Sequence, residues 1–193
     1  VTGGGVVGLL TALFALHHGA REVALADPDP QRLAIAAALG VETVDERRTE
    51  TEPWRWCKER WVHGPGDRGA EVVFQCRGRA AVLHEALRSL RPQGAVIDLA
   101  FYQGGAPELR LGEEFHHNGL TIRCAQVARV PRGLAGAWDR RRLAEETGRL
   151  LAARGDAIRR HLITDVIPIE EGPAFLAALA RREHTAVQVV FAF

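Results

Sequence analysis

The sequence has no methionine, a single tyrosine and only three cysteines, which stand far apart. Cys57, Cys76 and Cys124 form no C-x-x-C pair, so their spacing predicts neither a zinc ribbon nor a disulfide framework. We expect inert thiols that are wholly or partly buried. Because a reading frame begins with methionine, we also expect that the natural N-terminus precedes Val1 and that the first strand is truncated.

The sequence also lacks an excess of charge of either sign. Its 25 basic and 24 acidic residues leave a formal net charge of +1. A chain with no large field of one sign has little attraction for polyanions or for an anionic membrane surface. We therefore expect no nucleic acid partner and no membrane partner.

No hydrophobic run is long enough to cross a bilayer. The apolar stretch 6–16 is shorter than the roughly 20 residues that a membrane-spanning helix needs. It has no basic segment before it and so does not resemble a secretory signal. We expect a soluble, cytoplasmic protein.

What the sequence does contain is typical of a globular chain, with 47% hydrophobic and 25% charged residues among 193. This length suits one domain, or one domain and a fraction. A chain of this size buries roughly 70% of its unfolded surface, so it can fold without a disulfide or a structural metal.

Short β-rich runs alternate with helical patterns through the first part of the chain, which predicts βαβ units and a parallel sheet. Val1-Thr2 is interpreted as the end of a first strand. Further strands are predicted at 22–26, 41–44, 71–76, 95–101 and 120–126, with a turn at 92–94. Helices are predicted at 6–16, 30–39, 79–90 and 138–153. The last part of the chain differs, with an extended segment at 162–169, a helix at 172–180 and a strand at 187–193.

Three tryptophans lie in the otherwise irregular stretch 45–69. Trp54, Trp56 and Trp61 fall in a short predicted helix that ends before Gly64. Tryptophans near arginines can stack on nucleic acid bases, but no basic patch accompanies them. A helix that covers the edge of the sheet is therefore the better interpretation.

Gly3, Gly5 and Gly8 satisfy the pattern G-x-G-x-x-G between a predicted strand and a predicted helix. The first glycine allows a tight turn, the second lets the backbone approach a pyrophosphate, and the third lets the helix pack closely on the strand. The start of the helix adds free N–H groups and the positive end of its dipole. The motif alone is weak evidence, because glycine-rich turns are common.

Asp27 strengthens the motif, because it follows Gly8 by 19 residues and ends the second predicted strand. A carboxylate at this place binds the hydroxyl groups of the adenosine ribose, and its charge repels a 2′-phosphate. The plainer alternative is a turn or helix-cap residue. With all these parts in register, the sequence predicts an α/β protein with a Rossmann fold, a doubly wound parallel sheet that binds NAD in preference to NADP.

With these motifs, the sequence resembles the nucleotide-binding and C-terminal part of the medium-chain dehydrogenase/reductases, the zinc-type alcohol dehydrogenase superfamily. The segments 3–8, 26–33, 69–76 and 87–94 carry the resemblance. Segment 114–123 and Trp138-Asp139 are similar to a group near threonine, sorbitol and bacteriochlorophyllide dehydrogenases. The resemblance implies an NAD-binding Rossmann domain at 1–160. It also implies that 161–193 is the C-terminal remnant of a GroES-like catalytic domain whose body this sequence lacks.

The resemblance also implies a reaction, which is hydride transfer between nicotinamide and a small alcohol or carbonyl substrate. Zinc would assist it through ligands in the missing N-terminal domain, so no metal ligand and no catalytic residue is assigned here. The resemblance further implies a homodimer or homotetramer, with an interface along the strand near 120–126.

For the cofactor, the resemblance implies contacts in three groups. The glycine-rich turn meets the pyrophosphate, the end of the second strand with its following helix surrounds the adenosine, and the ends of later strands border the adenine and the nicotinamide. The residues are Gly3, Gly5, Val6, Val7 and Gly8 in the first group; Asp27, Arg32 and Cys76 on the adenosine side; and Leu99 and Ala100 on the nicotinamide side.

Other polar residues have a plainer interpretation. Adjacent histidines on a helix point about 100° apart, so neither His17-His18 nor His116-His117 suits a shared metal ion. Tyr102 could touch a substrate, but packing is the simpler role. Asp98 lies within an apolar strand, and we expect a polar partner for it across the cleft.

Two other functions stay open from the sequence. One is a zinc-free quinone or enoyl reductase of the same superfamily, which only N-terminal cysteines would distinguish. The other is a non-catalytic dinucleotide-binding module. The segment 162–193 argues against that module, because its pattern is typical of half an interface to a second domain.

Overall fold

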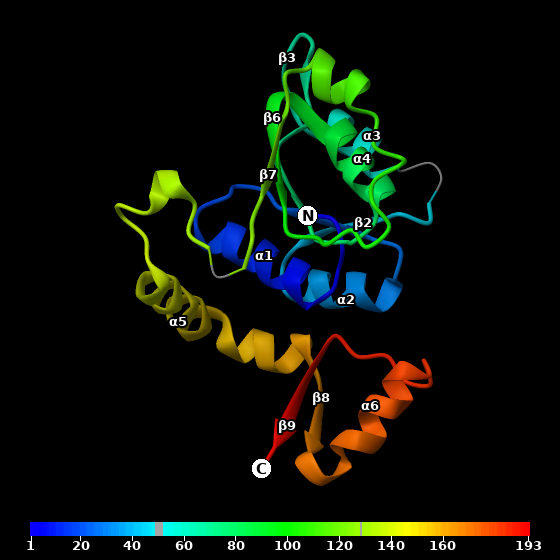
Figure 1. Ribbon diagram of the computed structural model, residues 1–193, viewed down its shortest axis with the longest axis vertical. Helices are drawn as coiled ribbons and strands as arrows, with labels where there is room; N and C mark the ends of the chain where they lie inside the picture. The colour runs from blue at the N-terminus through cyan, green and yellow to red at the C-terminus, as the bar shows by residue number, and fades with distance from the viewer. Residues whose placement is uncertain (49–51, 128) are drawn as a thin grey trace.

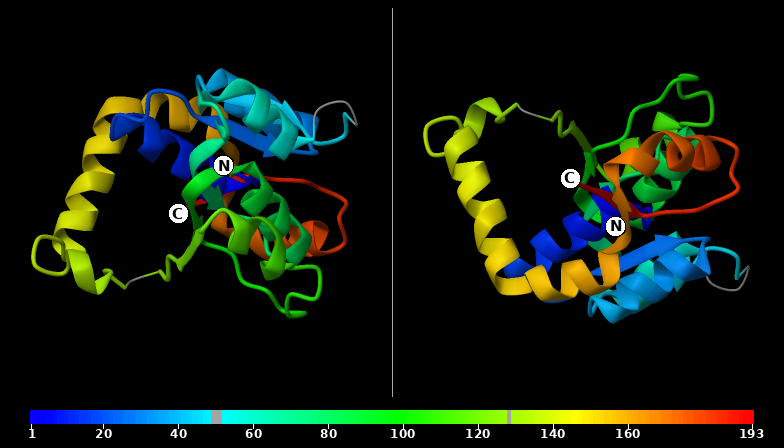
Figure 2. Two further views of the ribbon diagram at one scale, coloured as in Figure 1. Left: turned by 90° about the horizontal axis from the view of Figure 1, so that it is seen from above. Right: turned by 90° about the horizontal axis from the view of Figure 1, so that it is seen from below.

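The computed structural model describes residues 1–48, 52–127 and 129–193. A central sheet with helices on both faces forms the upper body in Figure 1, and a smaller lobe that contains the C-terminus lies below it. The long helix α5 (Arg140–Ala157) runs between the two parts. In the views of Figure 2, α5 and the segment before it extend to one side of the body.

The sheet of the upper body is parallel throughout. β1 (Ala24–Asp27) pairs with β2 (Glu42–Asp45), and β6 (Leu90–Asp98) pairs with both β5 (Ala70–Gln75) and β7 (Thr121–Cys124). Thr2 joins the two groups through parallel bridges to Ala26 and Gln75. The strand order is therefore β2, β1, Val1–Thr2, β5, β6, β7, with a reversal of winding between Thr2 and β5. This order is that of a doubly wound Rossmann sheet, so the predicted fold class is confirmed.

Helices cover both faces of this sheet because successive strand side chains point to opposite sides. Leu25 packs with α1 (Val6–His17) and α2 (Pro30–Ala38) on one face. Its neighbours Ala24 and Ala26 face the other side, where they pack with Val44 against Trp56 and Trp61. These tryptophans lie in and just after α3 (Pro53–Arg60), so α3 covers the sheet as predicted. α4 (Ala80–Ser89) packs on β5 and β6.

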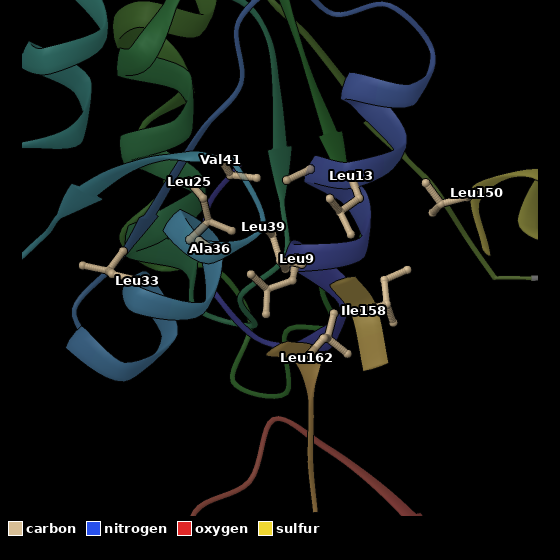
Figure 3. Close-up of a cluster of buried hydrophobic side chains, with 11 residues drawn as sticks. Leu9, Leu13, Leu25, Leu33, Ala36, Leu39, Val41, Leu150, Ile158 and Leu162 are labelled. Atoms are coloured by element: carbon tan, nitrogen blue, oxygen red, sulfur yellow. The ribbon is translucent and has the colours of Figure 1, made fainter. Parts of the chain in front are cut away.

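The C-terminal lobe is a second small unit. β8 (Ile163–Pro168) and β9 (Gln188–Ala192) form a parallel pair, and α6 (Gly172–Ala180) joins them. These elements lie where the sequence predicts them. The lobe is anchored to the upper body by Leu150, Ile158 and Leu162, which are buried in one cluster with α1 and α2 (Figure 3).

Some boundaries differ from the predictions. The turn expected at 92–94 lies inside β6, where Gln93 adopts a positive φ of 61°. β6 ends at Asp98 and not at Phe101, because the Asp98 carboxylate accepts the N–H of Ala100 and turns the chain. The helix expected at 138–153 begins at Arg140 and continues to Ala157. The sequence did not predict the hairpin β3 (Val62–Gly64) and β4 (Asp67–Arg68), nor the short helical turns 111–115, 132–134, 158–162 and 169–171.

No helix within residues 1–48, 52–127 and 129–193 is both long and apolar enough to cross a membrane.

Candidate functional site

The glycine-rich turn connects Thr2 to α1 at the carboxyl edge of the sheet. Gly3 has a φ of +99°, a conformation that side chains oppose. A Cβ atom on Gly8 would stand only 1.8 Å from the carbonyl oxygen of Gly3. The backbone conformation at Gly3 and the close backbone contact at Gly8 therefore both require glycine. These two glycines allow the tight turn and the close packing of the helix on the strand.

Gly5 is different, because a Cβ atom there would meet no atom within 4 Å. Gly5 is the N-cap of α1, and its carbonyl accepts the first helical hydrogen bond from Leu9. The N–H groups of Val6, Val7 and Gly8 precede that bond and have no acceptor within the helix. Since the first turn carries no acidic residue, the open space beside Gly5 suits an anion such as a pyrophosphate.

Asp27 lies at the end of β1 and is only 2% exposed. One carboxylate oxygen accepts the N–H of Gly4 at 2.7 Å, and the other accepts the N–H of Asp29 at 2.8 Å. The Arg32 guanidinium stands 3.9 Å from the same carboxylate. Asp27 thus serves as a turn residue and also touches the glycine-rich turn. A carboxylate has about four acceptor positions, so two accepted bonds leave other acceptor positions unused.

The end of β5 borders the turn from the other side. The Cys76 N–H donates to the carbonyl of Thr2 at 3.0 Å, and burial raises the pKa of the Cys76 thiol. The next side chain, Arg77, lies across Gly3 and meets Glu46, which follows β2, with 2.5 Å between Nη1 and Oε2. This ion pair is not predictable from the sequence, because no spacing rule connects residues 31 positions apart.

A chain of polar side chains lies at the ends of β5 and β6. Tyr102 donates its hydroxyl to Asp98 at 3.0 Å and accepts a bond from Gln75 at 3.3 Å, and Gln75 also bonds to Thr2. Burial, as the largest cause, raises the pKa of Tyr102 to about 12. Asp98 therefore has a polar partner, but this partner lies four residues along the chain and not across the cleft as expected. Leu99 and Ala100 follow it directly, which places them at the same edge of the sheet as Gly5.

The structure thus gathers the ten predicted cofactor residues at one edge. Gly3, Gly5, Val6, Val7, Gly8, Asp27 and Arg32 lie on one side of the winding reversal, and Cys76, Leu99 and Ala100 lie on the other. In open α/β sheets, ligands bind at the carboxyl edge where the winding reverses. The arrangement can hold an extended ligand with a central pyrophosphate.

The comparison with known families decides what kind of protein this is. The family model described as "Zinc-binding dehydrogenase" matches residues 6–141, more than two thirds of the chain. The chain belongs to the zinc-binding dehydrogenase family. The matched region begins at Val6, directly after Gly3–Gly5 of the turn, and contains β1 and β5–β7.

One curated relative matches this zinc-binding dehydrogenase chain over almost its whole length. It is a protein of Agrobacterium fabrum, provisionally named D-xylulose reductase, which is 29% identical over 194 residues, 98% of this chain and 49% of the relative. The chain thus spans about half the length of the relative.

Solved structures show the same fold. The short chain alcohol dehydrogenase of Escherichia coli CFT073, solved with NADH, is 15% identical with a TM-score of 0.73, over 100% of this chain and 51% of that one. A protein of Sinorhizobium meliloti 1021, provisionally named a zinc-binding dehydrogenase and bound to NADP, is 24% identical with a TM-score of 0.72, over 100% and 51%. At these identities the likeness shows the fold alone.

The family name raises the question of metal ligands. Among the residues that the structure describes, no group of three His, Cys, Asp or Glu side chains could hold a metal ion. The rings of His17 and His18 meet edge to face, as do those of His116 and His117. These residues do not fit a zinc site, and we assign no chemical step to a metal here.

A cavity of about 380 Å³ reaches Thr2, Ala26 and Phe74, but Gly3, Gly5 and Gly8 do not line it. Its lining includes Val1, Ala24 and Ala70, at the amino ends of the strands, together with Trp56 and Trp61. Because parallel sheets bind ligands at their carboxyl ends, we do not interpret this cavity as the cofactor site.

Proposed function

We propose that this chain binds NAD at the glycine-rich turn and takes part in hydride transfer between the nicotinamide ring and a small alcohol or carbonyl substrate. The observation that carries the proposal is the hydrogen bond from the Gly4 N–H to the buried Asp27 carboxylate. This bond holds the Asp27 carboxylate, which would bind the ribose, next to the glycine-rich turn, which would bind the pyrophosphate.

Each part of the site has a distinct task in this proposal. The N–H groups of Val6 and Val7 would hold the pyrophosphate where Gly5 leaves space. Asp27, with Arg32, would hold the adenosine ribose, and Leu99 and Ala100 would border the nicotinamide. When bound, NAD supplies the hydride chemistry, and the protein supplies binding and orientation. Similar folds solved with NADH and with NADP support a nicotinamide dinucleotide as the ligand.

We place substrate binding and any zinc ligands in a further domain, in keeping with the length of the relatives. The C-terminal lobe supports this, because Val166 and Val190 are exposed on its two-stranded sheet. Parallel strands are usually covered on both faces. We therefore propose that 161–193 docks on that domain.

A homodimer or homotetramer through β7 is also part of the proposal. Among the described strands, β7 pairs only with β6 and leaves its other edge open. Light scattering tests this proposal. A monomer over the working range of concentrations would refute it for this chain.

The cofactor preference tests the main proposal. We expect NADH to bind more tightly than NADPH, because the Asp27 carboxylate repels a 2′-phosphate. Asp27→Asn keeps one acceptor oxygen and removes the charge, so the preference should shrink by about tenfold. Fluorescence titration of the 193-residue chain measures both affinities. Equal affinity of the unmodified chain for the two cofactors, or binding of neither, would overturn the proposal.

A further inference from the structure

Asp98 is a buried charge in an unusual place, at the last position of a central strand. It is 9% exposed and ends β6, between the uncharged ends of β5 at Gln75 and β7 at Cys124. One carboxylate oxygen accepts both the Ala100 N–H at 3.1 Å and the Tyr102 hydroxyl at 3.0 Å. Since burying a carboxylate is costly, its presence here calls for an explanation beyond packing.

The bonds of Asp98 fix the segment that follows β6. Tyr102 is held by Asp98 and also by Gln75, which is fully buried and donates to the carbonyl of Arg77 at 2.8 Å. On the other side, a Cβ atom on Gly78 would stand 2.5 Å from the carbonyl of Phe101. The segment 99–102 is thus clamped between the ends of β5 and β6.

The charge of Asp98 also acts on its surroundings. Burial is the main cause that raises the pKa values of Tyr102 and of the Cys76 thiol, and the charge of Asp98 adds to the rise of both. Tyr102 closely follows Leu99 and Ala100 along the chain, so it borders the half of the site where the proposed function places nicotinamide. The nicotinamide ring is positively charged in NAD⁺ and neutral in NADH. A carboxylate near it therefore interacts favourably with the oxidised form alone.

We infer that Asp98 has two roles in the nicotinamide half of the site. It positions the segment 99–102, and it favours the oxidised cofactor over the reduced one. This inference rests on the proposed function. It makes Asp98 a positioning residue that also tunes the balance between NAD⁺ and NADH.

The test compares three ligands on the 193-residue chain: NAD⁺, NADH and ADP-ribose, which lacks nicotinamide. Asp98→Asn keeps an acceptor for Ala100 and Tyr102 and removes the charge. We expect the ratio of the dissociation constants, NAD⁺ over NADH, to rise about fivefold, while ADP-ribose binding changes less than twofold. Tyr102→Phe leaves the charge in place, so both dinucleotides should weaken equally, by about threefold, with ADP-ribose unchanged.

Asp45→Asn is the matched control. It removes a carboxylate charge at the end of β2, in the adenosine half, where Asp45 is paired with Arg47, and should leave the ratio unchanged. The inference is overturned if Asp98→Asn leaves the ratio unchanged, or if it weakens ADP-ribose binding as much as NAD⁺ binding. Either result would leave the proposed function intact. If the unmodified chain bound none of the three ligands, both proposals would fail together. Thermal unfolding of each variant shows whether the fold persists.

Discussion

Gly8 packs against Gly3 so closely that a Cβ atom on Gly8 would lie 1.8 Å from the Gly3 carbonyl oxygen. The obstacle is backbone and cannot rotate away. We therefore predict that Gly8→Ala destabilises the fold by about 3 kcal/mol, the upper end for overpacked sites. The melting temperature should fall by roughly 6–12 °C. A calorimetric scan measures it, and an unchanged melting temperature would show that the helix can move off the strand.

Gly5→Ala, in the same turn, is predicted to separate binding from stability. Nothing lies within 4 Å of the added methyl group, and the backbone of Gly5 is extended. The melting temperature should therefore stay within about 1–2 °C, as for other tolerated surface changes. NADH affinity should fall at least tenfold, because the methyl group occupies the space that we assign to the pyrophosphate. Unchanged NADH binding would remove Gly5 from the site.

The pH dependence of Tyr102 offers a third prediction. It is the one tyrosine of the chain, so phenolate absorbance at 295 nm reports it directly. We expect half-ionisation near pH 12 in the folded protein and near pH 10 in urea. Because the folded state holds this proton more tightly than the unfolded state, the group lowers stability progressively as the pH rises from 10 to 12. The Tyr102→Phe variant should lack this part of the alkaline destabilisation. Half-ionisation of Tyr102 at pH 10 in the native protein would contradict this prediction.

A fourth prediction concerns the anchor of the C-terminal lobe. Leu150 is 1% exposed in the cluster that joins α5 to α1 and α2, whereas its neighbour Leu151 is 50% exposed. Leu150→Ala should cost about 2–5 kcal/mol of unfolding free energy through the cavity it leaves. Leu151→Ala should change it by less than about 0.5 kcal/mol. Urea unfolding compares the two, and equal effects would place the anchor elsewhere.

The sequence predicted the parts of the structure that depend on local pattern. The strands and helices follow hydrophobic periodicity, and Gly3 to Gly8 and Asp27 follow a spacing that the chemistry of the phosphate-binding turn dictates. The bonds that join distant residues were not predictable in this way. Glu46 meets Arg77, and Tyr102 bridges Asp98 and Gln75, because strand order brings them together. The early end of β6 has a local origin, because it depends on one side-chain bond that Asp98 accepts from the N–H of Ala100, and hydrophobic periodicity does not show such a bond.

The most direct test of the central claim is a crystal structure of this chain with NADH bound. We predict that the pyrophosphate binds to the N–H groups of Val6 and Val7 beside Gly5. The adenosine ribose should lie within hydrogen-bond distance of Asp27, and the nicotinamide beyond Asp98. A structure in which the dinucleotide occupies the cavity lined by Trp56 and Trp61, or in which its adenosine ribose lies away from Asp27, would contradict this prediction.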